Sequence, residues 1–111
     1  TEYFDNGRTK YEGEWKAGRF DGHGTEWQEN GHKAYQGHFK AWQLDGYGKE
    51  YFDDGRIWYE GGWKRGLRDG HGTEYRHRTG TKAYEGHFKA GHLDGNFTEY
   101  FDNGKVRYHV E

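Results

Sequence analysis

Aromatic and polar residues alternate along much of this chain, and glycines recur among them at regular intervals. Between residues 9 and 16, for example, Tyr11, Gly13 and Trp15 alternate with charged residues. A period of two is typical of β-strands, and the many aromatic side chains favour strands as well. Asn-Gly or Asp-Gly pairs, such as Asn6-Gly7, separate several of these runs and favour tight hairpin turns. The pattern therefore predicts an all-β chain of short antiparallel hairpins.

The alternation is organised as a tandem repeat. The run that begins at Tyr11 returns at Tyr35, Tyr59 and Tyr84, at intervals of 24, 24 and 25 residues, and Tyr108 opens a further copy. A period of this length indicates one supersecondary unit stacked on its neighbours. We count positions within a unit from this Tyr, which is position 1. The expected single array consists of a partial unit at 1–10, whole units at 11–34, 35–58, 59–83 and 84–107, and a partial unit at 108–111.

The hairpin turns predict which residues face each other. If Asn6 and Gly7 form a two-residue type I′ loop, Phe4 faces Thr9 and Glu2 faces Tyr11. Extended to the other units, this register puts the rings of positions 1 and 5, the glycines of positions 3 and 14 and the glutamates of position 16 on one face. Facing glycines leave a bare strip of backbone, which neighbouring rings can cover. One extra residue before Gly80 predicts a three-residue loop with a bulge in the third unit.

This register predicts an elongated, single-layer antiparallel sheet. About ten strands, each roughly 4.8 Å from the next, give a sheet roughly 45 Å wide that twists and curls into a groove. A single layer cannot bury both faces, so we expect accessible rings and an aromatic groove that binds a ligand. Two tryptophans depart from the repeat, because Trp42 replaces a glycine and Trp58 has Ala34, Ala83, Lys10 and Arg107 as counterparts. The predicted groove residues are Tyr11, Trp15, Tyr35, Phe39, Tyr59, Trp63, Tyr84, Phe88, Trp42 and Trp58.

Composition narrows the classes of function. The chain has no Cys, which leaves no thiol nucleophile and no thiolate metal site. Its charge of −2 is mixed in sign, whereas a nucleic-acid interface needs a basic surplus. A catalytic carboxylate pair needs two different environments, but every unit repeats the same ones. We therefore expect no enzyme, no cofactor and no nucleic-acid partner. No compartment is identified, and the absence of a long apolar run or signal peptide favours a cytoplasmic location.

Histidines recur at two positions of the unit and raise the question of a metal site. In the predicted register His23 faces His38, and His71 faces His87. Two opposed imidazoles can share a metal ion. No third ligand recurs beside them, although structural zinc sites have four. We expect these four histidines to be exposed polar residues and predict no metal site.

The recurring pattern Tyr-x-Gly-x-Trp/Phe-x-x-Gly-x-x-x-Gly-x-Gly resembles the MORN (membrane occupation and recognition nexus) repeat over nearly the whole chain. Residues 95–105, in which Phe97 replaces a glycine, resemble a bacterial variant that occurs in antitoxin components. The resemblance implies an elongated single-layer sheet that acts as a non-enzymatic scaffold. It also implies protein partners, self-association or binding to membranes and phospholipids.

Several hypotheses about function remain open. The first is a scaffold that binds a protein or peptide segment in the aromatic groove and self-associates weakly through its sheet edges. The second is a phospholipid-binding surface, based on one lysine per unit at position 6. The third is a designed or consensus repeat without a natural ligand, because units one and three share one motif and units two and four another. An aromatic-glycine repeat that binds choline or glycans fits the spacing less well.

Overall fold

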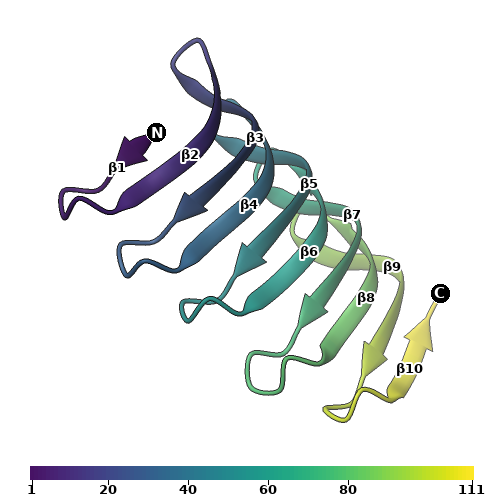
Figure 1. Cartoon of the computed structure of the whole chain (residues 1–111). Coiled ribbons are helices and arrows are strands. Elements are labelled where there is room, and N and C mark those ends of the chain that lie inside the picture. Colours follow the sequence, from purple (N-terminus) through teal and green to yellow (C-terminus); the bar gives the residue numbers. More distant parts are fainter.

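The computed structural model describes residues 1–111 as one open sheet of ten antiparallel strands, ordered as in the sequence (Figure 1). The all-β, single-layer prediction is confirmed. The strands are β1 (Glu2–Tyr3), β2 (Thr9–Lys16), β3 (Arg19–Trp27), β4 (Lys33–Lys40), β5 (Gln43–Tyr51), β6 (Ile57–Lys64), β7 (Leu67–Tyr75), β8 (Lys82–Lys89), β9 (His92–Tyr100) and β10 (Val106–Val110). The structure contains no helix with the length and apolar character needed to cross a membrane.

The sheet is long and curled. Its extents are 45 × 27 × 15 Å, so its length equals the predicted width of ten strands. Each hairpin bends along its length, as Figure 1 shows, and we call the face on the inside of this bend the inner face. The bend has a cause in the Asp-Gly step of each unit. In the first unit Gly13 pairs with Gly24 but Trp15 pairs with Phe20, so β3 carries extra residues around Gly22, whose φ is +94°. Such bulges bend the strand that contains them.

The predicted register is confirmed along the strands. Glu2 faces Tyr11, Gly24 faces Gly37, and Glu26 faces Tyr35. Residues that face each other directly share a face of the sheet. The position-1 rings and the position-16 glutamates therefore lie together on the inner face.

The predicted type I′ turn at Asn6-Gly7 is wrong. Only Gly7 has a positive φ, and the Phe4 amide donates to the Arg8 carbonyl at 2.8 Å, which encloses three loop residues. The side chain of Asn6 stabilises this three-residue loop, because its Oδ1 accepts a hydrogen bond from the Arg8 amide at 2.9 Å. Phe4 thus pairs with Arg8 instead of Thr9, and a bulge in β2 restores the Glu2–Tyr11 pair. In the third unit, Arg76 pairs with Thr81 around four residues instead of the predicted three.

Type I′ turns occur at the other end of the hairpins. Ala17 and Gly18 have φ values of +52° and +76°, so both central residues are left-handed, as this turn requires. The second residue of this turn is position 8 of the unit, which is glycine in three units and Trp42 in the second. The sequence motif Gly-x-x-Asp-Gly did not reveal this turn type, since its Asp-Gly belongs to the bulge and not to the turn.

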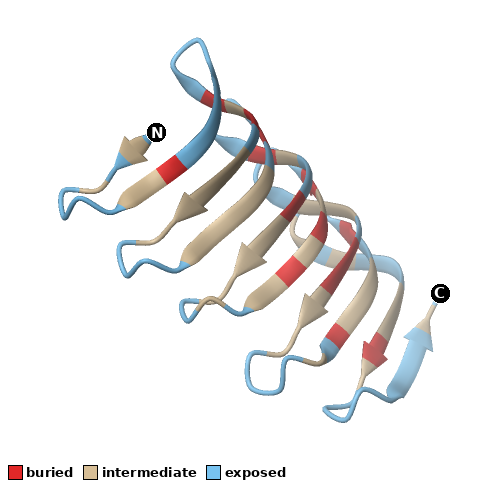
Figure 2. Cartoon of the chain, in the orientation of Figure 1, coloured by how far each residue is buried: buried red, intermediate tan, exposed pale blue.

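The core is a row of rings on the inner face. Figure 2 shows that the buried positions are spread along the sheet. Seven side chains form the buried cluster: Tyr11, Phe20, Phe39, Leu44, Tyr59, Trp63 and Phe88. The Tyr11 ring stacks on Phe20 with centroids 3.6 Å apart. Full burial of such side chains stabilises the fold by about 1.5–3 kcal/mol each. Phe20 and Leu44 occupy position 10, which the sequence analysis did not assign to the core.

Candidate binding site on the inner face

The inner face alternates between two arrangements of the position-1 ring. In the first and third units Tyr11 and Tyr59 are completely buried, and each lies over the position-14 glycine of its unit, Gly24 or Gly72. The Tyr11 hydroxyl donates to the Glu14 carbonyl at 3.0 Å, and the Tyr59 hydroxyl makes the equivalent bond to position 4 at 3.0 Å. These two units are closed, because the ring leaves no space above the glycine.

The second unit is open. Its position-14 glycine, Gly48, is covered by Leu44 and Trp63 instead of by Tyr35. The Trp63 indole donates its Nε1–H to the Gly48 carbonyl at 3.0 Å, which anchors the ring on the glycine. Trp63 comes from the following unit, and the units that follow Gly24 and Gly72 have a phenylalanine, Phe39 or Phe88, at the same position. The larger indole therefore occupies the place of the tyrosine, and Tyr35 remains only half-buried.

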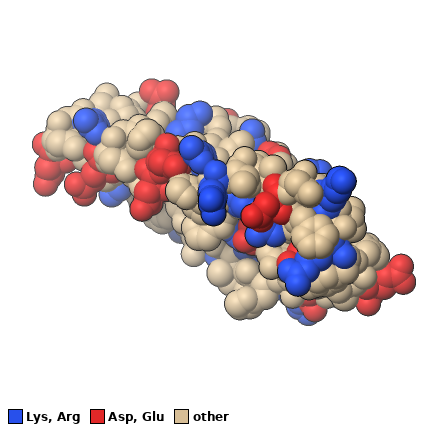
Figure 3. Space-filling model, turned by 90° about the horizontal axis from the view of Figure 1, so that it is seen from below, with Lys and Arg blue, Asp and Glu red and all other residues tan.

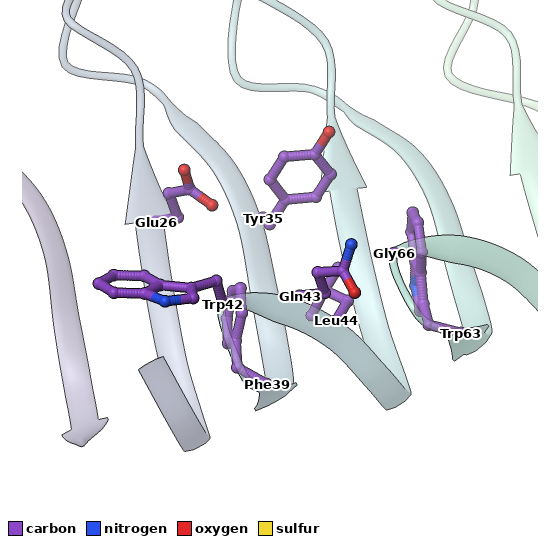
Figure 4. Close-up of a pocket in the computed structure, with 8 residues that line it drawn as sticks. All are labelled: Glu26, Tyr35, Phe39, Trp42, Gln43, Leu44, Trp63 and Gly66. Atoms are coloured by element: carbon purple, nitrogen blue, oxygen red, sulfur yellow. The ribbon is translucent and has the colours of Figure 1, made fainter. Parts of the chain in front are cut away.

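A pocket of about 170 Å³ opens beside Tyr35. Figure 4 shows Tyr35 and the Glu26 carboxylate on one side, Trp42 and Trp63 at the two ends, and Leu44 and Phe39 beneath. Tyr35 and Trp63 meet edge to face with centroids 6.1 Å apart. The complete lining is Glu26, Tyr35, Phe39, Trp42, Gln43, Leu44, Trp63 and Gly66. Aromatic faces around one carboxylate form a site suited to a cation.

Trp42 is held at the pocket in an unfavourable backbone conformation. Its φ is +79°, a value that its counterparts adopt as glycines, and the left-handed region costs other residues about 1–2 kcal/mol. The turn still forms a backbone contact with the first unit, in which the Trp42 amide donates to the Phe20 carbonyl at 3.1 Å. The indole packs on Phe20 at 4.5 Å and meets Trp15 at 5.8 Å, yet the residue stays 46% exposed. Strain retained at an exposed aromatic residue is typical of functional sites.

Glu26 differs from the other glutamates of position 16 in its electrostatics. The others pair with a basic side chain: Glu2 with Lys10 at 3.3 Å, Glu50 with Arg68 at 3.3 Å, Glu74 with Arg68 at 2.9 Å and Glu99 with Arg107 at 3.3 Å. Glu26 has neither an ion pair nor a hydrogen bond. Burial raises the pKa of its carboxyl, while Lys10 lowers this pKa and Glu2 raises it further. The pocket thus contains a partly desolvated carboxylate without a partner.

The third unit shows how this chain fills the same place. Arg68 stands at position 10, where the other units have Phe20, Leu44 and Leu93. Its guanidinium lies 4.5 Å from the centre of the Tyr59 ring and within 6 Å of the Trp58 and Phe88 rings, while it bridges two glutamates. The Arg68 side chain is only 12% exposed. A cation between carboxylates and aromatic faces is therefore already part of the fold.

The structure places the ten predicted groove residues in three groups. Tyr11, Phe39, Tyr59, Trp63 and Phe88 are buried, Tyr35, Trp58 and Tyr84 are half-buried, and Trp15 and Trp42 are exposed. Four of the ten line the pocket: Tyr35, Phe39, Trp42 and Trp63. The sequence analysis missed Glu26, Leu44 and Arg68. Alignment of the units could have revealed Arg68, since it is a charged residue at a position that is apolar in the other three units.

Trp58 belongs to the filled site of the third unit. Its ring stacks on Phe52 at 4.9 Å, and Arg68 lies over it at 5.1 Å. The counterpart of Trp58 one unit earlier is Ala34. Trp58 therefore contacts a cation of its own chain.

The histidines lie in the predicted pairs. His23 faces His38 with ring centroids 5.4 Å apart, and His71 faces His87. No group of three or more His, Asp or Glu side chains is placed to hold a metal ion. These pairs therefore lack the further ligands that a zinc site needs.

The outer face is engaged in contacts within the chain. The hydroxyl groups of Tyr75 and Tyr100 donate to Glu60 and Glu85 at 2.6 and 2.9 Å. Burial raises the pKa of Tyr75, and the hydrogen bond to Glu60 raises it further. Figure 3 shows basic and acidic side chains intermixed on the surface in view. Mixed signs at this density give no broad basic patch.

Comparison with known families completes the description of the site. The model of the MORN repeat matches residues 11–33, 35–55 and 59–77. The model of a MORN repeat variant matches residues 93–111, the part of the chain that contains Phe97. A search of curated protein sequences finds no match.

Proposed function

Because this chain belongs to the MORN repeat family, whose members are generally non-enzymatic modules for protein or membrane interaction, we propose that it binds a segment of a partner protein along its inner face. The observation that supports this most is an excess of accessible aromatic surface. Trp15 and Trp42 are 38% and 46% exposed beside the 170 Å³ pocket, although the rings beneath them already form the core. Tryptophan is enriched among the residues that dominate binding energy at protein interfaces.

The dimensions of the inner face suit an extended peptide. The sheet is 45 Å long, and an extended chain rises about 3.3 Å per residue, so about 13 residues span it. The position-1 rings and the position-16 carboxylates alternate along this path, and Glu26 is the carboxylate without a basic partner in the chain. A partner segment with apolar side chains and one basic side chain opposite Glu26 complements this surface.

Selection of peptides tests this proposal. A random 12-residue library is displayed against the whole chain, and the affinity of selected peptides is measured by fluorescence anisotropy. Trp42→Ala on the inner face should weaken binding at least tenfold, as loss of a central aromatic contact does. The control is Tyr47→Ala, because Tyr47 is 59% exposed and its hydroxyl contacts Glu60 on the outer face. Equal weakening by both substitutions, or failure to select any peptide, would contradict the proposal.

Membrane-surface binding is the second candidate. The lysines of position 6 are exposed and make no ion pair: Lys16, Lys40, Lys64 and Lys89. Each basic residue near an anionic membrane contributes about 1 kcal/mol of attraction. Flotation with vesicles that contain phosphatidylserine, at low and high salt, tests this alternative. Salt-sensitive flotation that is lost when the four lysines are changed to glutamine supports it, and absence of flotation at low salt excludes it.

We also propose a second copy of the chain as a partner, bound through the sheet edges. The strand β10 is free along one edge, and its Val106 and Tyr108 are 58% and 45% exposed. An unpaired edge can pair with the opposite edge, β1, of a second copy. The sedimentation coefficient should therefore increase with concentration, and Val106→Lys should reduce this increase. A concentration-independent monomer would contradict the idea.

A further inference from the structure

We propose that the pocket of the second unit binds the guanidinium group of an arginine side chain in the partner segment. This inference rests on the proposed function and specifies the chemistry of one contact within it. Arg68 occupies the equivalent place in the third unit, whereas the second unit has an open pocket there.

Three of the five groups that Arg68 contacts have counterparts in the pocket of the second unit. Arg68 contacts Glu50, Tyr59 and Phe88, which are position 16 of the second unit, position 1 of the third and position 5 of the fourth. One unit earlier, these positions are Glu26, Tyr35 and Trp63. All three line the pocket. The counterparts of the other two contacts, Glu74 and Trp58, do not line it. The pocket therefore repeats part of the Arg68 site one unit earlier along the sheet, without the arginine.

The residue that replaces the arginine is Leu44. The Leu44 side chain packs against Gly48 and belongs to the core cluster. The second unit therefore provides no basic side chain beside Glu26. Lys10, the basic residue that acts on the Glu26 pKa, is engaged in its ion pair with Glu2 at 3.3 Å. Glu26 is thus left with rings on one side and open space on the other. A buried carboxylate gains most from a charged partner that also donates hydrogen bonds.

Trp42 adds a ring that the third unit lacks. The counterpart of Trp42 in that unit is Gly66, and there the aliphatic stem of Arg68 comes from the chain itself. A guanidinium that enters from outside has no such covalent support. The Trp42 indole supplies an aromatic wall at the mouth of the pocket, and planar guanidinium groups stack well on such surfaces. The strained backbone of Trp42 is consistent with this role.

The geometry favours arginine over lysine. The Arg68 group bridges two carboxylates while it contacts three rings, which uses its flat shape and its several N–H donors. An ammonium is compact and strongly hydrated, so it gains less between aromatic faces. The pocket repeats one of these carboxylates and two of these rings, and should repeat this preference.

Titration of the whole chain with small amides tests the inference. The probes are N-acetyl-arginine amide, the lysine amide, and the citrulline amide, which has nearly the shape of arginine without its charge. Two-dimensional ¹H–¹⁵N spectra follow the indole N–H signals of the tryptophans. The arginine amide should shift the Trp42 and Trp63 signals in a saturable manner. The Trp58 signal should stay in place, because Arg68 already covers that ring.

Two variants and the other probes decide the result. Glu26→Gln should weaken binding of the arginine amide about tenfold, because it removes the charged acceptor but keeps the shape. Trp42→Gly, which installs the residue of the other units, should weaken binding about fivefold and leave the dispersion of the spectrum unchanged. Equal shifts with the citrulline amide, equal affinity for the lysine amide, or no effect of Glu26→Gln would each overturn the inference.

The selected peptides separate this inference from the proposed function. Peptides that bind the inner face without an arginine, and are insensitive to Glu26→Gln, would overturn the guanidinium site but preserve the scaffold. Saturable binding of the arginine amide without any inner-face peptide would overturn the scaffold but preserve the site.

Discussion

The second and third units use the same frame but treat their inner faces differently. In the third unit Tyr59 covers Gly72, and Arg68 neutralises Glu50 and Glu74. In the second unit Trp63 covers Gly48, Leu44 replaces the arginine, and a pocket remains beside Glu26. The comparison teaches that the repeated residues build the sheet, whereas a few exceptions decide whether its inner face is filled or open. Site-directed changes in the two units test this contrast.

The largest difference should come from the glycines beneath the rings. In Gly72→Ala, the new methyl group collides with the ring and hydroxyl of Tyr59, which is fully buried and cannot move aside. We expect a loss of about 3 kcal/mol in the free energy of unfolding. In Gly48→Ala, the methyl group meets Leu44 at 2.9 Å and Trp63 at 3.2 Å, beside the pocket that gives these side chains room. The expected loss is about 1 kcal/mol.

Urea unfolding of both glycine variants, followed by tryptophan fluorescence, measures these losses. An equal loss for the two variants would show that the second unit is packed as tightly as the third. The difference between open and closed units would then be wrong.

Removal of the internal cation should have the next largest effect. Arg68→Leu gives the third unit the residue of the second and leaves Glu50 and Glu74 partly buried without a partner. We expect about 2 kcal/mol less stability at pH 7. Burial raises the pKa of Glu50 and Arg68 lowers it, so the pKa rises further in the variant. The native state then binds a proton more readily, and the loss should shrink as the pH falls toward 4.5. Unfolding curves at pH 7 and pH 4.5 check this, and a loss that is equal at both values would contradict it.

Alkaline titration gives a smaller effect in the closed unit. Burial raises the pKa of Tyr59 from 10.0 to about 12. A raised pKa stabilises the fold below the unfolded value, and this stabilisation is lost as the pH rises through the native value. The free energy of unfolding should therefore decrease between pH 10 and 12, and Tyr59→Phe should reduce the slope. At pH 7 this variant should lose about 1 kcal/mol with the hydrogen bond to Gly62. An unchanged slope would show that the pKa of Tyr59 is not raised in the native state.

The smallest effect should have opposite signs in the two units. Glu26 has a raised pKa, so its charge opposes folding at pH 7, and Glu26→Gln should stabilise the chain by about 0.5 kcal/mol. Glu50→Gln breaks the pair with Arg68 and should destabilise it by about 1 kcal/mol. The same unfolding assay at pH 7 compares them. Two changes of the same sign would mean that Glu26 already has a partner in solution.

Much of the fold was predictable from the sequence, because a sheet with period two and a repeated hairpin leaves few registers. The Glu2–Tyr11 and Gly24–Gly37 pairs were predicted correctly even though the Asn6-Gly7 turn was not. The Asn side chain favours a three-residue loop, and the bulge in β2 compensates for the extra residue. The pairing of the strands therefore did not depend on the turn type.

The pocket was less predictable, since it depends on contacts between units. The prediction named Trp42 as an exception, but the competition between Tyr35 and Trp63 for the space above Gly48 depends on ring size and on one hydrogen bond. Glu26 lacks a partner because Leu44 carries no charge. This becomes visible only when several units are compared. Arg68 was visible in the sequence as an exception at position 10, and its contacts explain why the exception matters.

The most direct test of the relation between the two units is to close the second one with its own arginine. Leu44→Arg places a guanidinium at position 10, as Arg68 does in the third unit. The measurement is the NMR titration of this variant with N-acetyl-arginine amide. The account predicts that the variant folds and that the Trp42 and Trp63 signals no longer respond, because Glu26 is already paired. A folded Leu44→Arg variant that still binds the amide with unchanged affinity would contradict it.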